Sequence, residues 1–298
     1  MRNLILSVLF VGILNSFAAF AESILPDDLH SMPVLIEIPL NNGKSSYGTG
    51  LYLCQSNQLF LVTAAHCLFN FDSTNFSELI NSNAILSSFV MGKDSSKKGK
   101  LYLDLNRLSE SSLVKRHRAH DIAVIKLAKI YSEQEGAPAD SPASVYYSGG
   151  VVSRIEAKKR FAVFFNVISF NEIYDGNETY ILGYPVELFN ERIPLEIDFN
   201  SPLIRKGIIS QKNRITQKLI IDSGVFGGNS GGPVLVCNHE LDKIPNVTSY
   251  RVAGLITQFV PYLTRIPTQI GVTNSAFVNS GYSIVEPIDY ALELMQQF

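Results

Sequence analysis

The chain has 298 residues and a formal net charge of −2, with 46% hydrophobic and 17% charged residues. This is the composition of an ordinary globular protein, long enough to bury a substantial core. Its near-neutral balance excludes a basic protein that binds nucleic acid through phosphate contacts, so we expect no nucleic acid partner.

The first predicted element is a signal peptide. A basic start, Met1-Arg2-Asn3, precedes an apolar stretch over residues 4–20 and a small-x-small sequence, Ala19-Phe20-Ala21. This pattern is typical of a secretory signal that is cleaved after Ala21. The apolar stretch is shorter than the ~20 residues that a membrane-spanning helix prefers. We therefore predict a signal peptide over residues 1–21, a bacterial protein that is secreted or periplasmic, and no stable membrane span after cleavage.

Short apolar runs, many of them alternating, then predict strands separated by Gly, Asn, Ser and Pro. The first six cover residues 34–39, 50–54, 59–63, 85–91, 101–105 and 122–127. A polar segment over residues 132–150 is interpreted as a linker. Six further runs cover residues 161–170, 179–182, 203–209, 218–222, 233–237 and 250–259.

This order predicts an all-β fold of two six-stranded antiparallel Greek-key barrels, with the active site in the cleft between them. The N-terminal barrel would span residues 22–140 and the C-terminal barrel residues 141–285. Helical spacing beside Pro287 predicts a C-terminal helix over residues 286–298.

Two residues of the first half are candidates for acid–base chemistry. His66 follows an apolar strand and two alanines, so its imidazole would face a cleft. Asp121 stands just before the strand over residues 122–127, where a carboxylate can lie under an imidazole and fix its tautomer. A histidine packed at a strand end and an aspartate at a strand start are the alternatives without a function.

The segment 228–233, Gly-Asn-Ser-Gly-Gly-Pro, carries the candidate nucleophile of the second half. Glycines on both sides allow a tight, partly left-handed turn that exposes the Ser230 hydroxyl. Such a turn would also gather the backbone N–H groups of Gly228, Asn229 and Ser230 into one concavity, as a developing oxyanion requires. A serine of this kind needs a base in hydrogen-bond reach, and His66 is the best candidate.

The same segment satisfies the Gly-x-Ser-x-Gly pattern of α/β-hydrolases. That fold places its histidine far downstream of the serine, whereas only His239 follows Ser230, nine residues on (239 − 230). The chain also lacks the alternation of helices and strands that the fold needs. We therefore reject this alternative.

Three segments together resemble the catalytic motifs of the chymotrypsin-fold serine proteases: residues 63–67 (Thr-Ala-Ala-His-Cys), 121–127 (Asp-Ile-Ala-Val-Ile-Lys-Leu) and 228–233. The resemblance implies that His66 is the general base, Asp121 the orienting acid and Ser230 the nucleophile. Asn229 replaces the aspartate of the animal digestive enzymes, which implies that no cleaved amino terminus activates the chain. The motifs and the segments around them also resemble those of bacterial enzymes such as the high-temperature-requirement family and the glutamyl endopeptidases.

The resemblance also implies a specificity pocket with Gly224 at its base. Its walls would be Val225 and Phe226, with the segment Thr257, Gln258 and Phe259. Because no acid stands at the base, cleavage after Lys or Arg is disfavoured, unless the Asp222 side chain turns inward. Phe259 would narrow the pocket toward small apolar residues.

The implied activity is that of an exported serine endopeptidase acting on proteins or peptides through an acyl-enzyme, and its activity should rise as His66 deprotonates, near pH ~7. A catalytically silent binding scaffold is the alternative. Neither a cofactor nor a metal is expected, because no Cys-x-x-Cys or His-x-x-x-His pair occurs. Cys54, Cys67 and Cys237 allow at most one disulfide, and a Cys54–Cys67 bridge stays open. The sequence does not indicate the oligomeric state.

Overall fold

The computed structural model describes residues 27–72, 75–88, 99–131, 144–147, 152–155, 166–189, 198, 201–240, 247–267 and 273–298. The predicted signal peptide lies outside these residues. The described residues form an all-β protein with two short α-helices, α2 (Leu105–Glu110) and α3 (Asp289–Met295). None of the described helices is long and apolar enough to cross a bilayer.

The N-terminal half is a nine-stranded sheet in the order β10-β9-β3-β2-β1-β6-β7-β11, with β8 paired to β9. Its strands are β1 (Pro33–Pro39), β2 (Ser45–Gln55), β3 (Gln58–Thr63), β6 (Asn83–Ser88), β7 (Gly99–Asp104), β8 (Val114–Arg116), β9 (Ala123–Tyr131), β10 (Ser144–Tyr147) and β11 (Val152–Ile155). A separate small hairpin joins β4 (Phe69–Asp72) to β5 (Asn75–Leu79).

This sheet has more strands than the six expected, and its described pairings leave it open rather than closed. The additional strands come partly from segments that the composition did not indicate. Strand β10 lies within the polar stretch interpreted as a linker, yet it pairs with β9, and β11 pairs with β7. Both strands occupy the ends of the sheet, where an edge strand needs little apolar patterning because only one side of it is paired.

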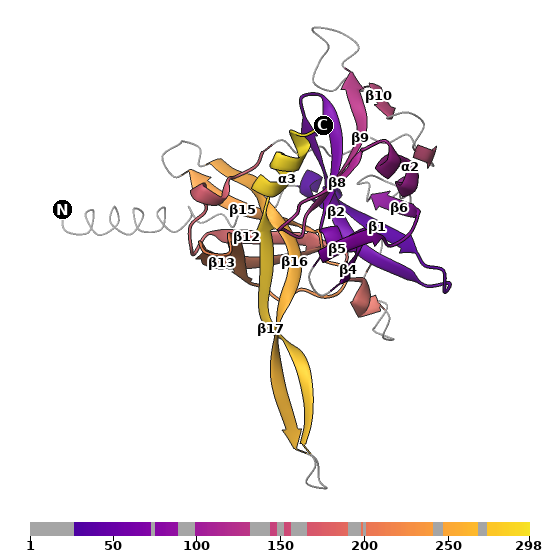
Figure 1. The fold of residues 1–298 in the computed structure, drawn as a ribbon. Coiled ribbons are helices and arrows are strands. Elements are labelled where there is room, and N and C mark those ends of the chain that lie inside the picture. The colour runs from indigo at the N-terminus through magenta and orange to yellow at the C-terminus, as the bar shows by residue number, and fades with distance from the viewer. Residues whose placement is uncertain are drawn as a thin grey trace, which may run out of the picture.

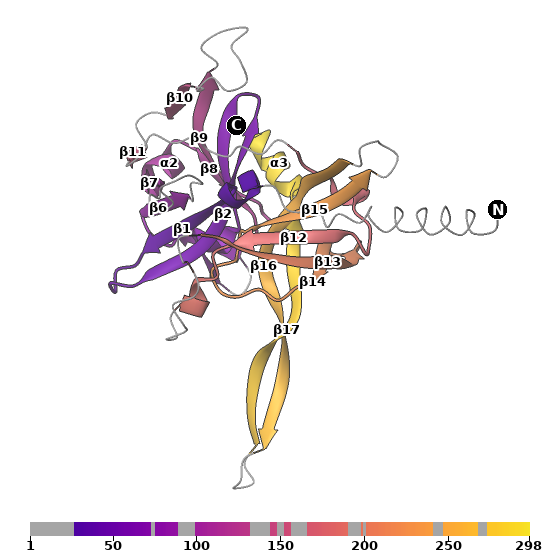
Figure 2. The same ribbon diagram turned by 180° about the vertical axis from the view of Figure 1, so that it is seen from behind.

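The C-terminal half is a closed antiparallel barrel of six strands in the order β12-β13-β14-β17-β16-β15. The sequence predicted a six-stranded barrel here, but two of its strands differ. The run over residues 161–170 forms no strand within its described part, residues 166–170, and β17 lies in a segment where no strand was predicted. The strands are β12 (Glu178–Gly183), β13 (Leu203–Asn213), β14 (Lys218–Asp222), β15 (Pro233–Glu240), β16 (Val247–Pro267) and β17 (Thr273–Pro287). The two halves lie side by side (Figures 1 and 2). The predicted architecture, all-β with two β units and a C-terminal helix, is confirmed.

One apolar cluster joins the two halves. It contains residues of the first sheet, of the barrel and of α3, including Leu53, Phe60, Val124, Leu235, Val252 and Leu294. Helix α3 follows the barrel strand β17 but packs against β9 of the first sheet. Full burial of each such side chain stabilises the fold by about 1.5–3 kcal/mol, so the cluster holds the two halves in a fixed relation. Separate clusters fill the first sheet and the barrel.

Strands β16 and β17 continue beyond the barrel as a two-stranded arm, in which Pro261 pairs with Asn279 and Pro267 with Thr273. Figures 1 and 2 show it projecting away from both halves. The sequence predicted a strand only as far as residue 259, whereas β16 continues through Pro261 to Pro267. Both strands of an isolated hairpin are edge strands, and an edge strand tolerates proline.

Candidate active site

His66 and Asp121 meet because their strands are neighbours. Strands β3 and β9 pair antiparallel, with Thr63 opposite Ala123. The end of β3, which leads to His66, therefore lies beside the start of β9, which follows Asp121. After β3 it forms a single 3-10 turn over Ala65–Cys67, which carries the imidazole.

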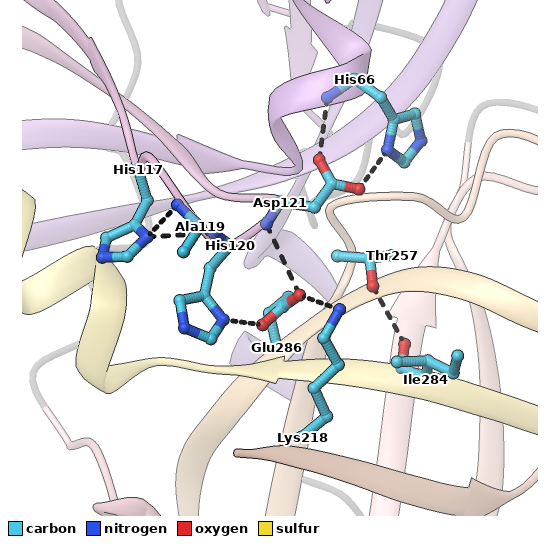
Figure 3. Close-up of polar contacts among 9 residues, drawn as sticks. All are labelled: His66, His117, Ala119, His120, Asp121, Lys218, Thr257, Ile284 and Glu286. Atoms are coloured by element: carbon cyan, nitrogen blue, oxygen red, sulfur yellow. Dashed lines mark hydrogen bonds and ion pairs between the residues drawn. The ribbon is translucent and has the colours of Figure 1, made fainter. Parts of the chain in front are cut away.

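The Asp121 carboxylate holds His66 at two points (Figure 3). Its Oδ1 accepts a hydrogen bond from the His66 backbone N–H at 2.9 Å, and its Oδ2 lies 2.6 Å from the His66 Nδ1. With a carboxylate as partner, Nδ1 carries a proton, which leaves Nε2 as the acceptor in the neutral ring. The pair thus has the orientation and tautomer that a general base requires.

Several groups act on the His66 pKa. Burial disfavours the imidazolium and alone would lower the pKa, but interactions with the Cys67 sulfur and the Asp121 carboxylate outweigh it. The net result is a His66 pKa raised above its ordinary value. The sequence alone had placed the pH-dependent step near ~7. We therefore expect His66 to lose its proton at a higher pH than the sequence alone indicated.

Glycines shape the turn that carries Ser230, as expected. Gly228 and Gly231 have φ of +98° and +81°, in the left-handed region. A Cβ at Gly228 would lie 2.3 Å from the Tyr184 carbonyl oxygen, and one at Gly231 would lie 2.0 Å from the Thr49 carbonyl oxygen. Neither position can hold a side chain without moving the backbone around it.

The hydrogen bonds of the turn decide which N–H groups face an anion. The Asn229 N–H donates to the Phe226 carbonyl at 3.0 Å, so it is already engaged, contrary to its expected role in the oxyanion hole. In the described part of the chain, no acceptor takes the N–H of Gly228 or of Ser230. These two groups are the ones available to a developing oxyanion.

Glu187 holds the peptide that precedes Gly228, a contact that the sequence did not reveal. Its backbone N–H donates to the Gly227 carbonyl at 3.0 Å, and its Oε2 accepts from the Gly227 N–H at 2.6 Å. Because the C=O and N–H of a trans peptide point in opposite directions, fixing the Gly227 carbonyl also fixes the direction of the Gly228 N–H.

Strand β2 attaches the serine turn to the N-terminal half. The Thr49 N–H donates to the Ser230 carbonyl at 2.7 Å, and the Cys67 Sγ approaches the same oxygen at 3.5 Å. Ser230 is therefore anchored beside the His66 turn. Within the described residues no hydrogen bond joins the His66 ring to the Ser230 hydroxyl. Such contacts often form only when substrate binds.

A cation stands at the base of the predicted specificity pocket. Arg205, on β13, donates from Nη1 to the Gly224 carbonyl, and its guanidinium lies 4.6 Å from the centroid of the Phe226 ring. A Cβ on Gly224 would lie 3.8 Å from the Arg205 Nη1 and 3.9 Å from the Asn279 Nδ2. Burial lowers the Arg205 pKa, but a guanidinium stays charged in proteins. Two hydrogen-bond donors therefore lie beside Gly224: the Arg205 Nη1, which donates to the Gly224 carbonyl, and the Asn279 Nδ2, which donates to the Val225 carbonyl at 2.6 Å. Sequence reasoning missed Arg205 because it lies 19 residues before Gly224.

The remaining pocket residues differ in exposure. Val225 and Thr257 are both buried, and the Thr257 hydroxyl donates to the Ile284 carbonyl at 3.4 Å. Gln258 is exposed, and Phe259, expected to narrow the pocket, is 38% exposed. The Asp222 side chain is also exposed and makes no ion pair within the described residues. The Asp222 side chain therefore does not turn inward, as a preference for lysine or arginine would have required.

All three cysteines are free, so the Cys54–Cys67 bridge does not form. The residue that faces Cys67 is Gly48, where a Cβ would lie 2.5 Å from the Cys67 Sγ. Cys54 instead pairs with Leu59 at the far end of β3 from His66.

A family model described as a trypsin-like peptidase domain matches residues 48–241. Among solved structures, the thermostable serine protease AL20 from an extremophilic microorganism is similar at 14% identity and a TM-score of 0.47, over 90% of this chain and 96% of that one. A serine endoprotease from Yersinia pestis is similar at 14% identity and a TM-score of 0.44, over 92% of this chain and 67% of that one. The search of curated proteins by sequence found no match.

Proposed function

This chain belongs to the trypsin-like peptidase family, and from that premise we propose that it is a serine endopeptidase with Ser230 as nucleophile, His66 as general base and Asp121 as orienting acid. The observation that carries the proposal is the two-point contact between His66 and Asp121, 2.9 and 2.6 Å long, beside a serine turn with two free N–H groups. The family alone would not assign these roles.

The proposed reaction proceeds through an acyl-enzyme. The Ser230 Oγ attacks a peptide carbonyl while His66 Nε2 takes the hydroxyl proton, and the oxyanion is stabilised by the N–H groups of Gly228 and Ser230. His66 then donates the proton to the leaving amine. Water attacks the acyl carbonyl by the reverse sequence of proton transfers, which frees the carboxylic acid and Ser230.

The proposed substrate has an acidic side chain immediately before the cleaved bond. Arg205 beside Gly224 offers a planar cation to a carboxylate, although its Nη1 also donates to the Gly224 carbonyl. The Asn279 Nδ2 donates one hydrogen to the Val225 carbonyl at 2.6 Å, which leaves its second hydrogen for a carboxylate. A lysine or arginine would instead meet a like charge in a half-buried site, where screening by solvent is weak. This replaces the small apolar preference predicted from the sequence.

Export also stays a proposal, supported by the basic start, apolar stretch and small-x-small sequence of residues 1–21. Secretion and a periplasmic location are both compatible with it. Mass spectrometry of the amino terminus in the producing cell tests it, because cleavage after Ala21 would leave a chain that begins with Glu22. An intact Met1 in the exported fraction would contradict the proposal.

The decisive experiment for the activity is labelling with a fluorophosphonate, which reacts only with an activated serine. We expect the wild type to be labelled and Ser230→Ala to be inert. Ser77→Ala is the matched control, since Ser77 is exposed and its hydroxyl bonds only the Asn70 carbonyl. Folded wild-type protein that takes no label would favour the silent binding scaffold.

A further inference from the structure

A carboxylate with no exposed surface lies directly behind Asp121. Glu286, near the end of β17, is 0% exposed. Its Oε2 is 2.8 Å from the His120 Nδ1, and its Oε1 is 2.6 Å from the Lys218 Nζ (Figure 3). The Asp121 backbone N–H donates to the same Oε1 at 3.5 Å. One buried side chain therefore contacts both residues 120 and 121 and a cation of the barrel.

A buried carboxylate is costly unless partners replace its water, so its presence needs an explanation. Lys218 supplies the opposite charge, because β14 and β17 pair with Leu219 opposite Val285, which brings Lys218 beside Glu286. His120 supplies the second partner, and its ring stacks on Tyr290 with centroids 3.4 Å apart and an interplanar angle of 15°. The partners of Glu286 thus come from both halves of the protein, Lys218 from β14 of the barrel and His120 with Asp121 from the segment before β9.

The arrangement limits how the His120–Asp121 segment can move. The His120 ring is fixed between Glu286 and Tyr290, and the Asp121 N–H points at the Glu286 carboxylate. The Asp121 side chain in turn holds both the N–H and Nδ1 of His66. Lys218, Glu286, Asp121 and His66 therefore form one chain of polar contacts from the barrel to the first sheet.

We propose that Glu286 is a positioning residue, which acts through Asp121 to hold His66 in the orientation for proton transfer. The proposal rests on the proposed function for its kinetic readout only. Its structural readout is the proton on His66 Nδ1, which a 2.6 Å contact to a carboxylate shifts far downfield in a proton NMR spectrum. That signal can be recorded whether or not the protein hydrolyses peptides.

The test compares Glu286→Gln with the wild type, using the full chain. The glutamine keeps the shape and one acceptor but loses the charge that binds Lys218 and His120. We expect kcat to fall by about ten- to a hundredfold with KM changed less than about twofold, and the His66 proton signal to shift or broaden. Glu293→Gln is the matched control, because Glu293 is exposed and contacts only the neighbouring His117, at 3.7 Å.

Two outcomes would overturn the proposal. A folded Glu286→Gln protein with the wild-type proton signal and kcat would show that Glu286 only stabilises the fold. If Glu286→Gln does not fold, Lys218→Gln tests the same contact from a half-buried position, and an unchanged proton signal in that variant would contradict the proposal. If the wild type shows the His66 Nδ1 proton signal but is not labelled by the fluorophosphonate, the proposed function is wrong. The role of Glu286 would then be tested by comparing that proton signal between the wild type and Glu286→Gln.

Discussion

The hydroxyl of Thr49 donates to the Gly228 carbonyl at 2.7 Å, although the two residues are 179 positions apart in the chain. The same hydroxyl oxygen accepts from the Tyr184 N–H at 3.1 Å, and Thr49 is fully buried. One threonine of the first sheet therefore fixes two segments of the barrel, including the turn that carries Ser230.

Thr49→Val should lower both stability and activity. Valine keeps the shape but removes the hydrogen bond to the Gly228 carbonyl and the one from the Tyr184 N–H, at a cost of about 1–3 kcal/mol. We expect a lower thermal midpoint and slower labelling by a fluorophosphonate. Thr216→Val is the control, since residue 216 is exposed in a turn. Equal thermal midpoints for the two variants would contradict this role of Thr49.

Gly228→Ala should abolish most of the activity, because the new Cβ would lie 2.3 Å from the Tyr184 carbonyl oxygen. The displaced turn would no longer direct the Gly228 N–H, and loss of one oxyanion donor typically costs about 10²- to 10³-fold in rate. Gly43→Ala provides a matched control, as Gly43 also has a positive φ, of +78°, but open space around its Cβ position. We expect that variant to lose about 1–2 kcal/mol of stability and to be labelled normally.

These residues also indicate how far the sequence could predict the site. The motifs around His66, Asp121 and Ser230 are local, and two of them sit at the ends of neighbouring strands, so their meeting follows from strand pairing. Thr49, Glu187 and Arg205 act through contacts with distant segments, and no spacing in the sequence relates them to the serine turn. The Thr49 contact depends on the packing of the two halves, and the Glu187 and Arg205 contacts depend on how the barrel and its loops fold.

The strands, too, could be predicted from the sequence only in part. Apolar runs predicted five of the six barrel strands and the strands of the first sheet over residues 34–39, 50–54, 59–63 and 122–127. They did not predict β10, nor β17 with the arm that it forms with β16. Strand β10 and the arm are paired on one side only, and the large apolar side chains of the arm, such as Tyr262, Leu263 and Phe277, are exposed rather than buried. Glu286 was placed in the C-terminal helix, because its spacing is helical, but it lies in β17 two residues after Ile284, and the helix begins at Asp289.

The pH dependence should report the raised pKa of His66. The proposed base acts when neutral, so activity should rise with pH through the raised pKa, with a midpoint above ~7. A raised pKa also means that His66 stabilises the fold fully below its unfolded value of about 6.5, and that this contribution is lost as pH rises through the folded pKa. Labelling rates measured from mildly acid to alkaline pH check the first point.

Cys67→Ala should move that midpoint to lower pH, because the Cys67 sulfur is one of the groups that raise the His66 pKa. The Asp121 contact remains in this variant, so labelling should persist at alkaline pH. Cys54→Ala is the control, since Cys54 lies at the other end of β3 and should leave the midpoint unchanged. A midpoint that is the same in all three proteins would exclude Cys67 as a cause.

Arg205→Gln should change which peptides are cleaved rather than whether cleavage occurs. A hydrogen bond to a charged group contributes about 1.5–3 kcal/mol, so the kcat/KM ratio of substrates with glutamate over those with glutamine before the cleaved bond should fall by roughly ten- to a hundredfold. Lys206→Gln, which alters the next residue, removes a cation that is exposed and paired with Glu178 at 3.0 Å, and it should keep the wild-type ratio. A peptide library in which the wild type prefers lysine or arginine at this position would contradict the assignment of Arg205 to the pocket. Equal loss of activity on all peptides would instead show that Arg205 only supports the Gly224 turn.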